Sequence, residues 1–356
     1  MSEKNNQVTI HGLVCPRPLT HDDIVVLGHG SGGKMTQDLI IRTFYPPLEN
    51  PALMRGDDAA VVELPQSGLL AISTDAHIVA PLFFPGGDIG RLAVAGTVND
   101  LAVMGAQPLW LTASFILEEG LPIFILEKVL ESMKATAHEA GVDVIAGDTK
   151  VAERGKADGI FITTSGIGVI PAGREVGGAK AEPGDAVLLS GPVGEHGIAV
   201  LAARGELEFE ADVISDVAPL NGLIETMFRA CPSIHVLRDP TRGGVATTLN
   251  EIARQSEVSI KIDEKTIPTT LPVMAACEML GFDPFYVANE GKVVAIVPAE
   301  YTDAVLKTMR AHPLGKQAVR IGEVTAEPAG RVLMKTAIGG TRVVDVLAGE
   351  MLPRIC

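Results

Sequence analysis

The sequence predicts a two-domain protein of the α/β or α+β class. Through the first half of the chain, β-rich runs alternate with helical runs. A stretch rich in Gly and Pro at 171–185 is then followed by a second set of the same kind, which indicates a domain boundary. The length of 356 residues also fits about two domains.

The first unit spans 22–170, and its strands and helices are distinguished by the spacing of apolar residues. We expect strands at 24–27, 59–64, 69–74, 109–115, 142–146 and 160–170. We expect helices at 35–44, 88–104 and 122–140.

The second unit spans 186–345, after a linker at 171–185. It opens with a strand at 186–190, continues with helices at 195–204, 219–230, 243–255 and 271–280, and has a further strand at 293–297. Residues 1–21 form an N-terminal extension. Residues 346–356 form a mobile tail, because Pro353 biases the residue before it toward an extended conformation.

The charge balance is strongly acidic. Lys and Arg total 29 against 44 Asp and Glu, a formal net charge of −15. This argues against non-specific binding to nucleic acid. A phosphate ligand is held most easily by such a chain if carboxylates bind a divalent cation between themselves and the ligand.

Membrane and secretory signals are absent from the sequence. No apolar run is long enough to cross a bilayer, and the polar N-terminus lacks the order of a signal peptide, so we expect a cytoplasmic protein. The four cysteines are too few and too scattered for a disulfide framework or a zinc motif. They are Cys15, Cys231, Cys277 and Cys356.

A glycine-rich segment, GHGSGGKM at 28–35, lies between an expected strand and an expected helix. It fits the GxxxxGK part of a P-loop but ends in Met35, where the P-loop needs a hydroxyl for magnesium. One interpretation is a plain glycine turn. The other, which we favour, is that backbone N–H groups and Lys34 close over a polyphosphate anchored elsewhere.

Carboxylates recur next to glycines or at strand ends. A single such Asp usually caps a turn or helix, but their density indicates a shared Mg²⁺. Asp100 falls on the apolar stripe of helix 88–104, where it would be desolvated and would need a metal, a donor network or an ion pair such as one with Arg91. The carboxylates are Asp57, Asp58, Asp75, Asp100 and Asp148.

Two further groups could carry chemistry. The run DPTRGG from Asp239 opens an expected helix, which Asp or Thr could cap and where Arg242 could grip a phosphate; such helix starts also occur without ligands. Lys150 and Glu290, at expected loop positions, form a possible acid/base pair, against which stands the simpler interpretation of solvated surface charges.

Cys356, the last residue, could be accidental. An exposed thiol on an extended arm would, however, suit a carrier that accepts a group from one protein and swings it into a site on its own body.

Several of these blocks together resemble the HypE family, the carbamoyl dehydratases of hydrogenase maturation in the PurM-like (aminoimidazole ribonucleotide synthetase) superfamily. The resemblance covers nearly the whole chain after about residue 21, and the C-terminal PRIC is its most specific part. The other blocks are FPGGDIG from Phe84, GTVNDLA from Gly96, GDTK from Gly147, RDPTRGG from Arg238 and NEGK from Asn289.

The resemblance implies a PurM-like fold, with an N-terminal ATP-binding domain whose sheet forms a homodimer interface and a C-terminal α/β domain. It implies ATP binding by Gly30, Gly32, Gly33, Lys34, Asp57, Asp75, Asn99, Asp148 and Arg242. It implies Mg²⁺ binding by Asp57, Asp58, Asp75, Asp100 and Asp148.

The resemblance also implies a reaction. A carbamoyltransferase, HypF, loads a carboxamide onto Cys356, and ATP-dependent dehydration leaves a thiocyanate. The cyano group passes through a HypC–HypD complex to the iron of a [NiFe] hydrogenase. Transfer of the γ-phosphoryl group makes the amide oxygen a leaving group, and Lys150 and Glu290 take part in removing the amide protons.

Two other functions remain open. The first is a sibling activity on the same fold, as a purine-pathway synthetase, thiamine-phosphate kinase or selenophosphate synthetase; the cysteine-terminated tail argues against all three. The second is a carrier that ferries a group on Cys356 without dehydrating it. The carboxylates distinguish this from an enzyme, since a carrier needs neither Mg²⁺ nor nucleotide.

Overall fold

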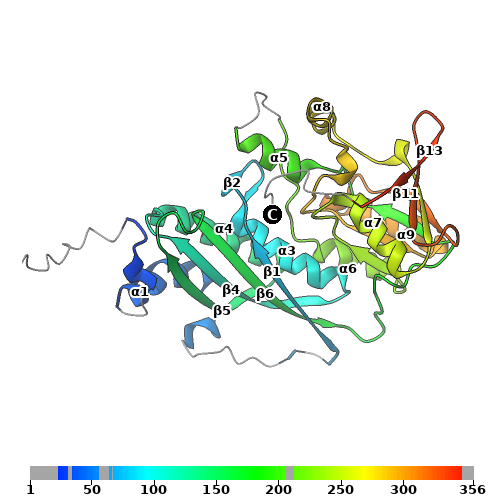
Figure 1. The fold of residues 1–356 in the computed structure, drawn as a ribbon. Helices are drawn as coiled ribbons and strands as arrows, with labels where there is room; N and C mark the ends of the chain where they lie inside the picture. The colour runs from blue at the N-terminus through cyan, green and yellow to red at the C-terminus, as the bar shows by residue number, and fades with distance from the viewer. Residues whose placement is uncertain (1–22, 31–33, 56–63, 66, 206–211, 347–356) are drawn as a thin grey trace, which may run out of the picture.

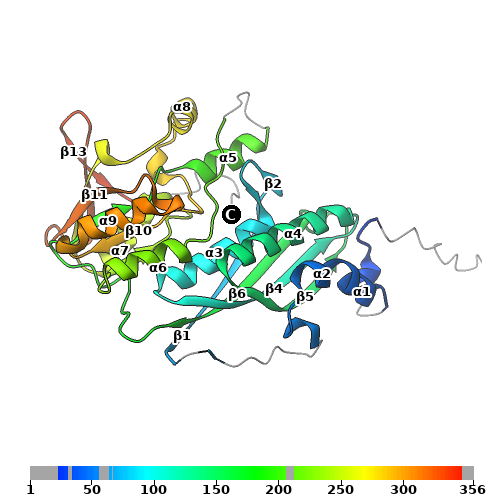
Figure 2. The ribbon, with the colours of Figure 1, turned by 180° about the vertical axis from the view of Figure 1, so that it is seen from behind.

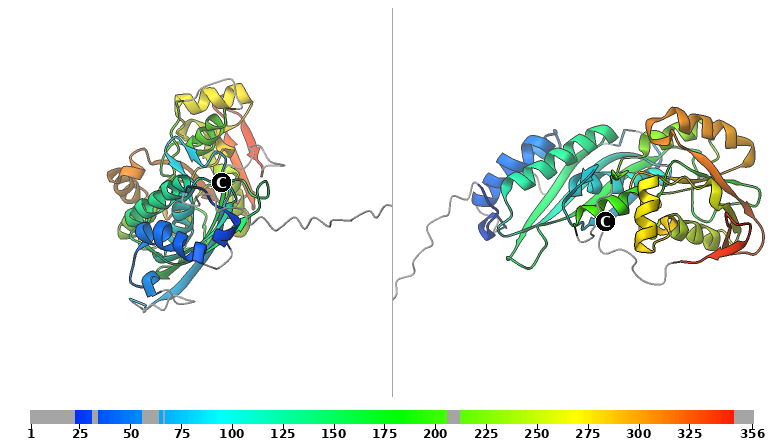
Figure 3. Two further views of the ribbon diagram at one scale, coloured as in Figure 1. Left: turned by 90° about the vertical axis from the view of Figure 1, so that its left-hand side faces the viewer. Right: turned by 90° about the horizontal axis from the view of Figure 1, so that it is seen from above.

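Two β-sheets, each packed against helices, form the protein (Figure 1). The computed structural model describes residues 23–30, 34–55, 64–65, 67–205 and 212–346. The mixed α/β class expected from the sequence is confirmed. Figure 3 shows the second sheet and its helices at one end of the first.

The first sheet has four strands in the order β1-β6-β4-β5. Neighbours pair antiparallel except β4 and β5, which are parallel. A short hairpin of β2 and β3 leads into the first long helix. The bounds are β1 (Leu69–His77), β2 (Phe83–Phe84), β3 (Gly87–Asp88), β4 (Gln107–Glu118), β5 (Asp143–Ala152) and β6 (Ile160–Ile170).

Two long helices, α3 (Ile89–Val103) and α4 (Ile123–Ala140), cover one face of this sheet; Figure 2 shows them in front of it. Asp88 caps α3 by accepting hydrogen bonds from the backbone N–H groups of Gly90 and Arg91. Thr164 of β6 donates to the backbone carbonyl of Ala93 over 3.0 Å, which fixes α3 on the sheet.

The opposite face of the sheet is open. Strand residues alternate between the two faces, and apolar side chains point outward from β1 and β4: Leu70, Ile72 and Ile116 are 52%, 70% and 42% exposed. An apolar sheet face of this kind is typical of a surface covered by another protein chain.

The N-terminal part is a series of short helices beside β5. Gly30 packs so closely there that a Cβ would lie 2.8 Å from the backbone nitrogen of Val151. The bounds are 3₁₀ turns at Leu27–Gly30 and Leu53–Arg55, α1 (Lys34–Leu39), a π turn at Ile40–Phe44 and α2 (Tyr45–Leu48).

Three expectations for this part differ from the structure. The strand expected at 24–27 is wrong, because only Ile24 pairs, in an isolated bridge to Pro122, before the chain turns into a 3₁₀ helix. The helix expected at 35–44 is shorter and gives way to a π turn at Ile40–Phe44. Of the strand expected at 59–64, residues 59–63 lie outside the described residues.

The second sheet has seven strands in the order β13-β12-β9-β11-β7-β10-β8. All pairs are antiparallel except β12 with β9. The bounds are β7 (Ala186–Leu189), β8 (Val236–Arg238), β9 (Ser259–Asp263), β10 (Val294–Val297), β11 (Val319–Thr325), β12 (Arg331–Lys335) and β13 (Thr341–Val344).

Helices pack on both faces of this sheet. Leu249 of α7 belongs to one apolar core with Leu189, whereas Met227 of α6 and Met309 of α9 belong to a second core with Leu188. Helix α6 also packs on α3, which joins the two halves. The helices are α5 (Glu195–Ala203), α6 (Asn221–Ala230), α7 (Gly244–Gln255), α8 (Leu271–Leu280) and α9 (Thr302–Ala311), with 3₁₀ turns at Glu264–Thr266, Pro284–Tyr286, Ala299–Tyr301 and Pro313–Gly315.

The chain leaves the second sheet after β13. The hydroxyl of Tyr286 donates to the backbone carbonyl of Asp345 over 2.9 Å and holds this point against the domain. The expected extension, and all of the expected tail except residue 346, lie outside the described residues. Within the described ranges, the helices are all too short or too polar to cross a bilayer.

Candidate active site

A cavity of about 250 Å³ lies where the two halves of the molecule meet. β1 and α3 contribute Asp75 and Asp100 from one side, and two segments of the second half contribute Asp239 and Glu290 from the other. Its complete lining is Asp75, Ala76, His77, Gly96, Asp100, Asp239, Thr241, Arg242 and Glu290. The cavity therefore contains four carboxyl groups.

Asp100 is placed in the cavity by α3, as its position on the apolar stripe predicts. The hydroxyl of Ser73 donates to Asp100 Oδ2 over 2.6 Å. Burial raises the pKa of Asp100, against the effect of the Ser73 hydrogen bond and together with repulsion by Asp75. The alternative ion pair with Arg91 is not formed, because that guanidinium lies 2.8 Å from Glu139.

His77 borders Asp75 but does not neutralise it. Its Nε2 lies 3.6 Å from Asp75 Oδ2 and 3.3 Å from the hydroxyl of Thr164. Burial lowers the pKa of His77 although Asp75 opposes this, so the ring is uncharged at pH 7. Gly96 permits this arrangement, because a Cβ there would lie 3.0 Å from His77 Cε1.

The second half of the molecule contributes two buried carboxyl groups. Burial, with repulsion from Asp100, raises the pKa of Asp239 to about 7. Burial, with repulsion from Asp239 and then Asp216, raises the pKa of Glu290 well above its usual value. In both cases the cavity disfavours the charged carboxylate unless a cation is close.

Asp239 does not cap the helix that follows it. Helix α7 begins after Gly243, which has a positive φ of 78° and no side-chain cap, so the expected cap by Asp239 or Thr241 is wrong. Asp239 instead lines the cavity. Sequence reasoning missed it as an acidic site residue, although the RDPTRGG block already singled it out.

The donor set fits a hard divalent cation. Carboxylate oxygens are preferred Mg²⁺ ligands, and a bound cation would stabilise the charged forms that burial and mutual repulsion disfavour at Asp100, Asp239 and Glu290. In the described part of the chain, no three His, Cys, Asp or Glu side chains converge as a complete ligand set. This agrees with the usual Mg²⁺ site, which takes one or two carboxylates and completes its shell with phosphates and water.

Asp148 and Lys150 lie elsewhere, on the edge strand β5. Lys150 Nζ is 3.0 Å from Asp148 Oδ2, and both side chains are about two-thirds exposed. The loop position expected for Lys150 is wrong, since it is a strand residue. The register pairs Asp148 with Ser114 and Lys150 with Ile116, which places both on the open face of the sheet.

The separation between Asp148 and the cavity follows from the same register. Asp75 pairs with Thr164, Thr164 with Ala113, and Ala113 with Gly147. Three strand spacings of about 4.8 Å place the backbones of β1 and β5 about 14 Å apart. Asp75 also faces α3, whereas Asp148 faces away from it, so one chain does not bring the two together.

The remaining predicted residues have varied positions. Gly30 lies beside β5, and Lys34 begins α1. Asn99 is buried: its Nδ2 donates to the Ala218 carbonyl over 3.1 Å, and its Oδ1 accepts from the Leu220 N–H over 2.7 Å. Its role in ATP binding stays a prediction. Gly32, Gly33, Asp57, Asp58 and Cys356 lie outside the described residues.

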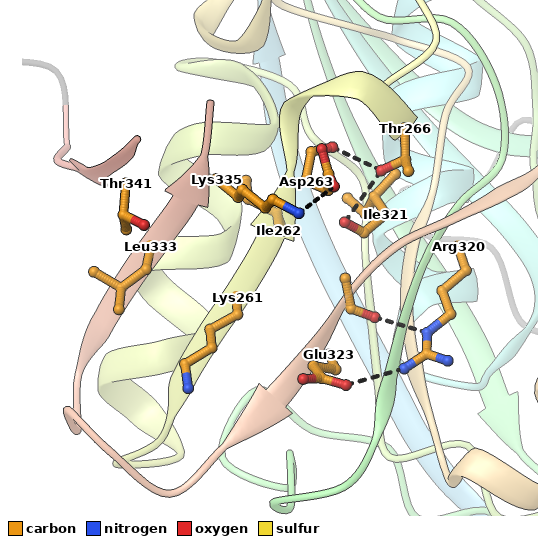
Figure 4. A pocket seen from close by; sticks show the side chains of 11 residues that line it. Lys261, Ile262, Asp263, Thr266, Arg320, Ile321, Glu323, Leu333, Lys335 and Thr341 are labelled. Carbon is orange, nitrogen blue, oxygen red and sulfur yellow. Dashed lines mark hydrogen bonds and ion pairs between the residues drawn. The ribbon is translucent and has the colours of Figure 1, made fainter. Parts of the chain in front are cut away.

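Another cavity, of about 530 Å³, lies on the outer surface of the seven-stranded sheet (Figure 4). Four of its five charged groups form ion pairs: Lys335 lies 3.8 Å from Asp263, and Arg320 lies 3.3 Å from Glu323. It shows no accumulation of buried charge, so the carboxylate cavity is the stronger candidate for the active site.

The two described cysteines are not nucleophiles. Cys231 and Cys277 are buried free thiols. Burial raises the pKa of Cys231, and it raises the pKa of Cys277 to about 11. Both therefore remain protonated at neutral pH.

Comparisons with known proteins agree with this architecture. Residues 56–170 match the family model for the AIR synthase related protein, N-terminal domain, and residues 182–335 match that for its C-terminal domain. The chain is 55% identical over 330 residues to carbamoyl dehydratase HypE of Cupriavidus necator, covering 93% of this chain and 94% of the relative.

Two solved structures are similar over most of the chain. A crystal structure of hydrogenase maturation protein HypE in complex with ATP has a TM-score of 0.89 and 49% identity, covering 93% of this chain and 99% of that one. A crystal structure of a HypE–HypF complex has a TM-score of 0.76 and 48% identity, covering 88% and 100%.

Proposed function

Because this chain belongs to the HypE family of carbamoyl dehydratases, we propose that it is an ATP-dependent enzyme of hydrogenase maturation. It dehydrates a carbamoyl group on its own Cys356 to a thiocyanate, the source of a cyanide ligand for the iron of [NiFe] hydrogenase. The observation that carries this proposal is the cavity lined by four carboxyl groups, three of which have pKa values raised mainly by burial. A mere carrier would gain nothing from such a cluster.

The carboxylate cavity is the proposed place of the ATP phosphates. One or two of Asp75, Asp100 and Asp239 would hold Mg²⁺, which would neutralise charge on the phosphates. Asp57 and Asp58 remain part of the predicted ligand set. Arg242, which lines the cavity, is proposed to contact a phosphate.

The dehydration proceeds in two balanced steps. The carbamoyl oxygen attacks the γ-phosphorus, the bond from that phosphorus to ADP breaks, and one N–H proton leaves. The carbon–oxygen bond then breaks with its electrons going to phosphate, the second N–H proton leaves, and its electron pair completes the nitrile. Glu290, which lines the cavity and whose pKa is raised mainly by burial, is the proposed proton acceptor.

A homodimer would complete the active site. We propose that two open sheet faces pack together about a two-fold axis parallel to the strands. This axis places β5 of one subunit beside β1 of its partner, whereas an axis across the strands would place β1 beside β1. Asp148 and Lys150 of one subunit would then approach the carboxylate cavity of the other. The exposed Leu70, Ile72 and Ile116 support this packing.

Other proteins supply and remove the cargo. The solved HypE–HypF complex of a relative supports HypF as the enzyme that loads Cys356 here. We further propose that a HypC–HypD complex receives the cyano group, and that the exchange takes place in the cytoplasm.

Mass spectrometry of the C-terminal peptide tests the function. After incubation with HypF, a carbamoyl donor and Mg-ATP, we expect a carbamoyl adduct on Cys356 that then loses one water. Cys356→Ala should bind ATP but gain no adduct. An adduct that persists in the presence of hydrolysable ATP would favour the carrier alternative, and labelling of Cys231 or Cys277 would contradict the assignment of the acceptor.

A further inference from the structure

The backbone around Glu290 is held from several sides. Asn289, on the N-terminal side of Glu290, is fully buried; its Oδ1 accepts from the N–H of Gly194 over 2.8 Å and its Nδ2 donates to the carbonyl of Pro240 over 3.0 Å. The Glu290 carbonyl accepts from Asn99 of α3 over 3.4 Å. The segment is therefore tied both to the loop that carries Asp239 and to the helix that carries Asp100.

Asp216 holds the same segment through two consecutive N–H groups. Its Oδ1 accepts from the N–H of Glu290, and its Oδ2 accepts from the N–H of Gly291, each over 3.1 Å. A Cβ at Gly291 would collide with the Asp216 carbonyl oxygen, so only glycine permits this contact. One carboxylate thus holds the two peptide planes that flank the Cα of Glu290.

Lys292 in turn fixes Asp216. Its Nζ lies 3.2 Å from Asp216 Oδ2 and 3.1 Å from Glu195 Oε2, and the Asp216 side chain is 1% exposed. These two carboxylates raise the pKa of Lys292 although burial opposes this, so the ammonium is charged. A buried ion pair is weak evidence for stability in itself, but it holds its members in one geometry.

These side chains lie behind the Glu290 segment. Lys292, Asp216 and Glu195 line a different cavity, of about 640 Å³, whereas Glu290 lines the carboxylate cavity. They line a separate cavity and therefore act on the reaction through Glu290, by holding its backbone and, for Asp216, also by repelling its carboxylate.

We propose that Asp216, fixed by Lys292, is a positioning residue for Glu290 and sets the point from which its carboxyl group takes the amide proton. The inference rests on the proposed function for the role of Glu290. Proton transfer depends steeply on the distance between the atoms concerned, and a displacement of about 1 Å can cost about 100-fold in rate.

Asp216→Asn tests this, because the amide has one acceptor in place of two and leaves the N–H of Glu290 or of Gly291 without a partner. We expect the single-turnover rate of water loss from carbamoylated Cys356 to fall about 10- to 100-fold. The dissociation constant for ATP should change less than about 3-fold. Amide hydrogen exchange across residues 287–293 should become faster, while exchange in α4 stays unchanged.

A second variant and two controls separate positioning from simple loss of structure. Lys292→Gln keeps a hydrogen-bond donor for Asp216 but removes the positive charge, so it should lower the rate in the same way but less strongly. It replaces Asp216→Asn in the test if that variant does not yield folded protein. Lys292→Arg retains the cation and should restore most of the rate. Lys180→Met breaks an exposed ion pair with Glu175 and should leave the rate unchanged.

The inference is overturned if both variants dehydrate at the wild-type rate, or if rate and ATP binding fall in parallel. It is also overturned if amide exchange across 287–293 is unaffected. If the wild type itself does not dehydrate the carbamoyl group, the proposed function fails instead, and the exchange measurement still decides whether Asp216 holds the segment.

Discussion

The carboxylate cavity and the edge strand β5 are built from similar residues in opposite surroundings. In the cavity, Asp100, Asp239 and Glu290 are desolvated, and their pKa values are raised by burial and mutual repulsion. On β5, Asp148 is exposed and paired with Lys150. Burial therefore favours the binding of a cation in the cavity. On β5 the charges of Asp148 and Lys150 already balance, and both side chains are exposed.

This contrast fits the division of the active site between two subunits that we propose. A carboxylate cluster can stay charged only where a cation joins it, so its members must converge from several elements into one enclosed space. An ion pair on an exposed strand has no such need. In the proposed dimer, the cavity would bind the charged reactant, and the β5 pair of the other subunit would complete the site.

The largest expected effect comes from Asp100→Asn in the cavity. The amide still accepts the Ser73 hydrogen bond but no longer supplies a charged ligand, so ATP turnover should fall by about 10²- to 10³-fold. The melting temperature should rise by about 2 °C or more, because the variant removes a desolvated, repelled carboxylate. Turnover assays and calorimetry measure the two effects.

Asp303→Asn is the matched control, since Asp303 is an exposed acid on α9. Neither turnover nor melting temperature should change in this variant. Wild-type turnover in Asp100→Asn would show that the cavity is not where ATP reacts.

A mixing experiment tests whether the two regions meet across a dimer. Asp100→Asn and Lys150→Met should each be inactive alone. In mixed dimers one of the two sites receives an intact cavity from one subunit and an intact β5 from the other. Since random exchange makes about half of the dimers mixed, about a quarter of the wild-type rate should return.

If both regions served the same subunit, every site in a mixed dimer would contain one of the two substitutions and no activity would return. Ile72→Lys in the open sheet face should prevent both dimerisation and this recovery. Sedimentation of the variants checks the oligomeric state directly.

A smaller effect is expected in the pH dependence of stability. Asp239 has a pKa of about 7 in the folded protein against a usual 3.8, so the folded state binds more protons between these values. Its favourable contribution is complete below about pH 4 and is lost as the pH rises to about 7. Between pH 5 and pH 7.5 we expect the free energy of unfolding without Mg²⁺ to fall by about 2.5 kcal/mol from this group.

Urea unfolding at pH 5 and pH 7.5 measures this slope. Asp239→Asn should flatten it, whereas Asp148→Asn, on the exposed strand, should leave it as it is. An equal slope in wild type and Asp239→Asn would mean that the Asp239 carboxyl group is not desolvated in the way described here.

The sequence predicted what depends on local periodicity. The helix stripe placed Asp100 in a desolvated position, and the helix over residues 271–280 has the predicted bounds. Strands β9 and β11–β13 were not predicted, because they are short and alternate charged with apolar residues, so only pairing with neighbours defines them.

Facts that depend on register could not be read from the sequence. Asp75 and Asp148 both end strand-like runs, and nothing local shows that they face opposite sides of the sheet at opposite edges. In the same way, RDPTRGG was interpreted as a helix cap because a cap is the commonest role of Asp before a helix. The turn at Gly243 begins the helix without it and leaves Asp239 for the cavity.

The hydrogen bond from Tyr286 to the carbonyl of Asp345 anchors the chain close to its last residues. The number of residues after this anchor limits how far the final residue can reach. Eleven residues follow that anchor, and a chain of this length reaches at most about 40 Å. With Cys356 as the proposed carrier, cargo on its thiol would be presented to its own protein at an effective concentration of about millimolar, however dilute the protein is. The catalytic centre would then need only weak intrinsic affinity for the group on Cys356. Weak affinity would in turn allow rapid release of the product group to the next protein.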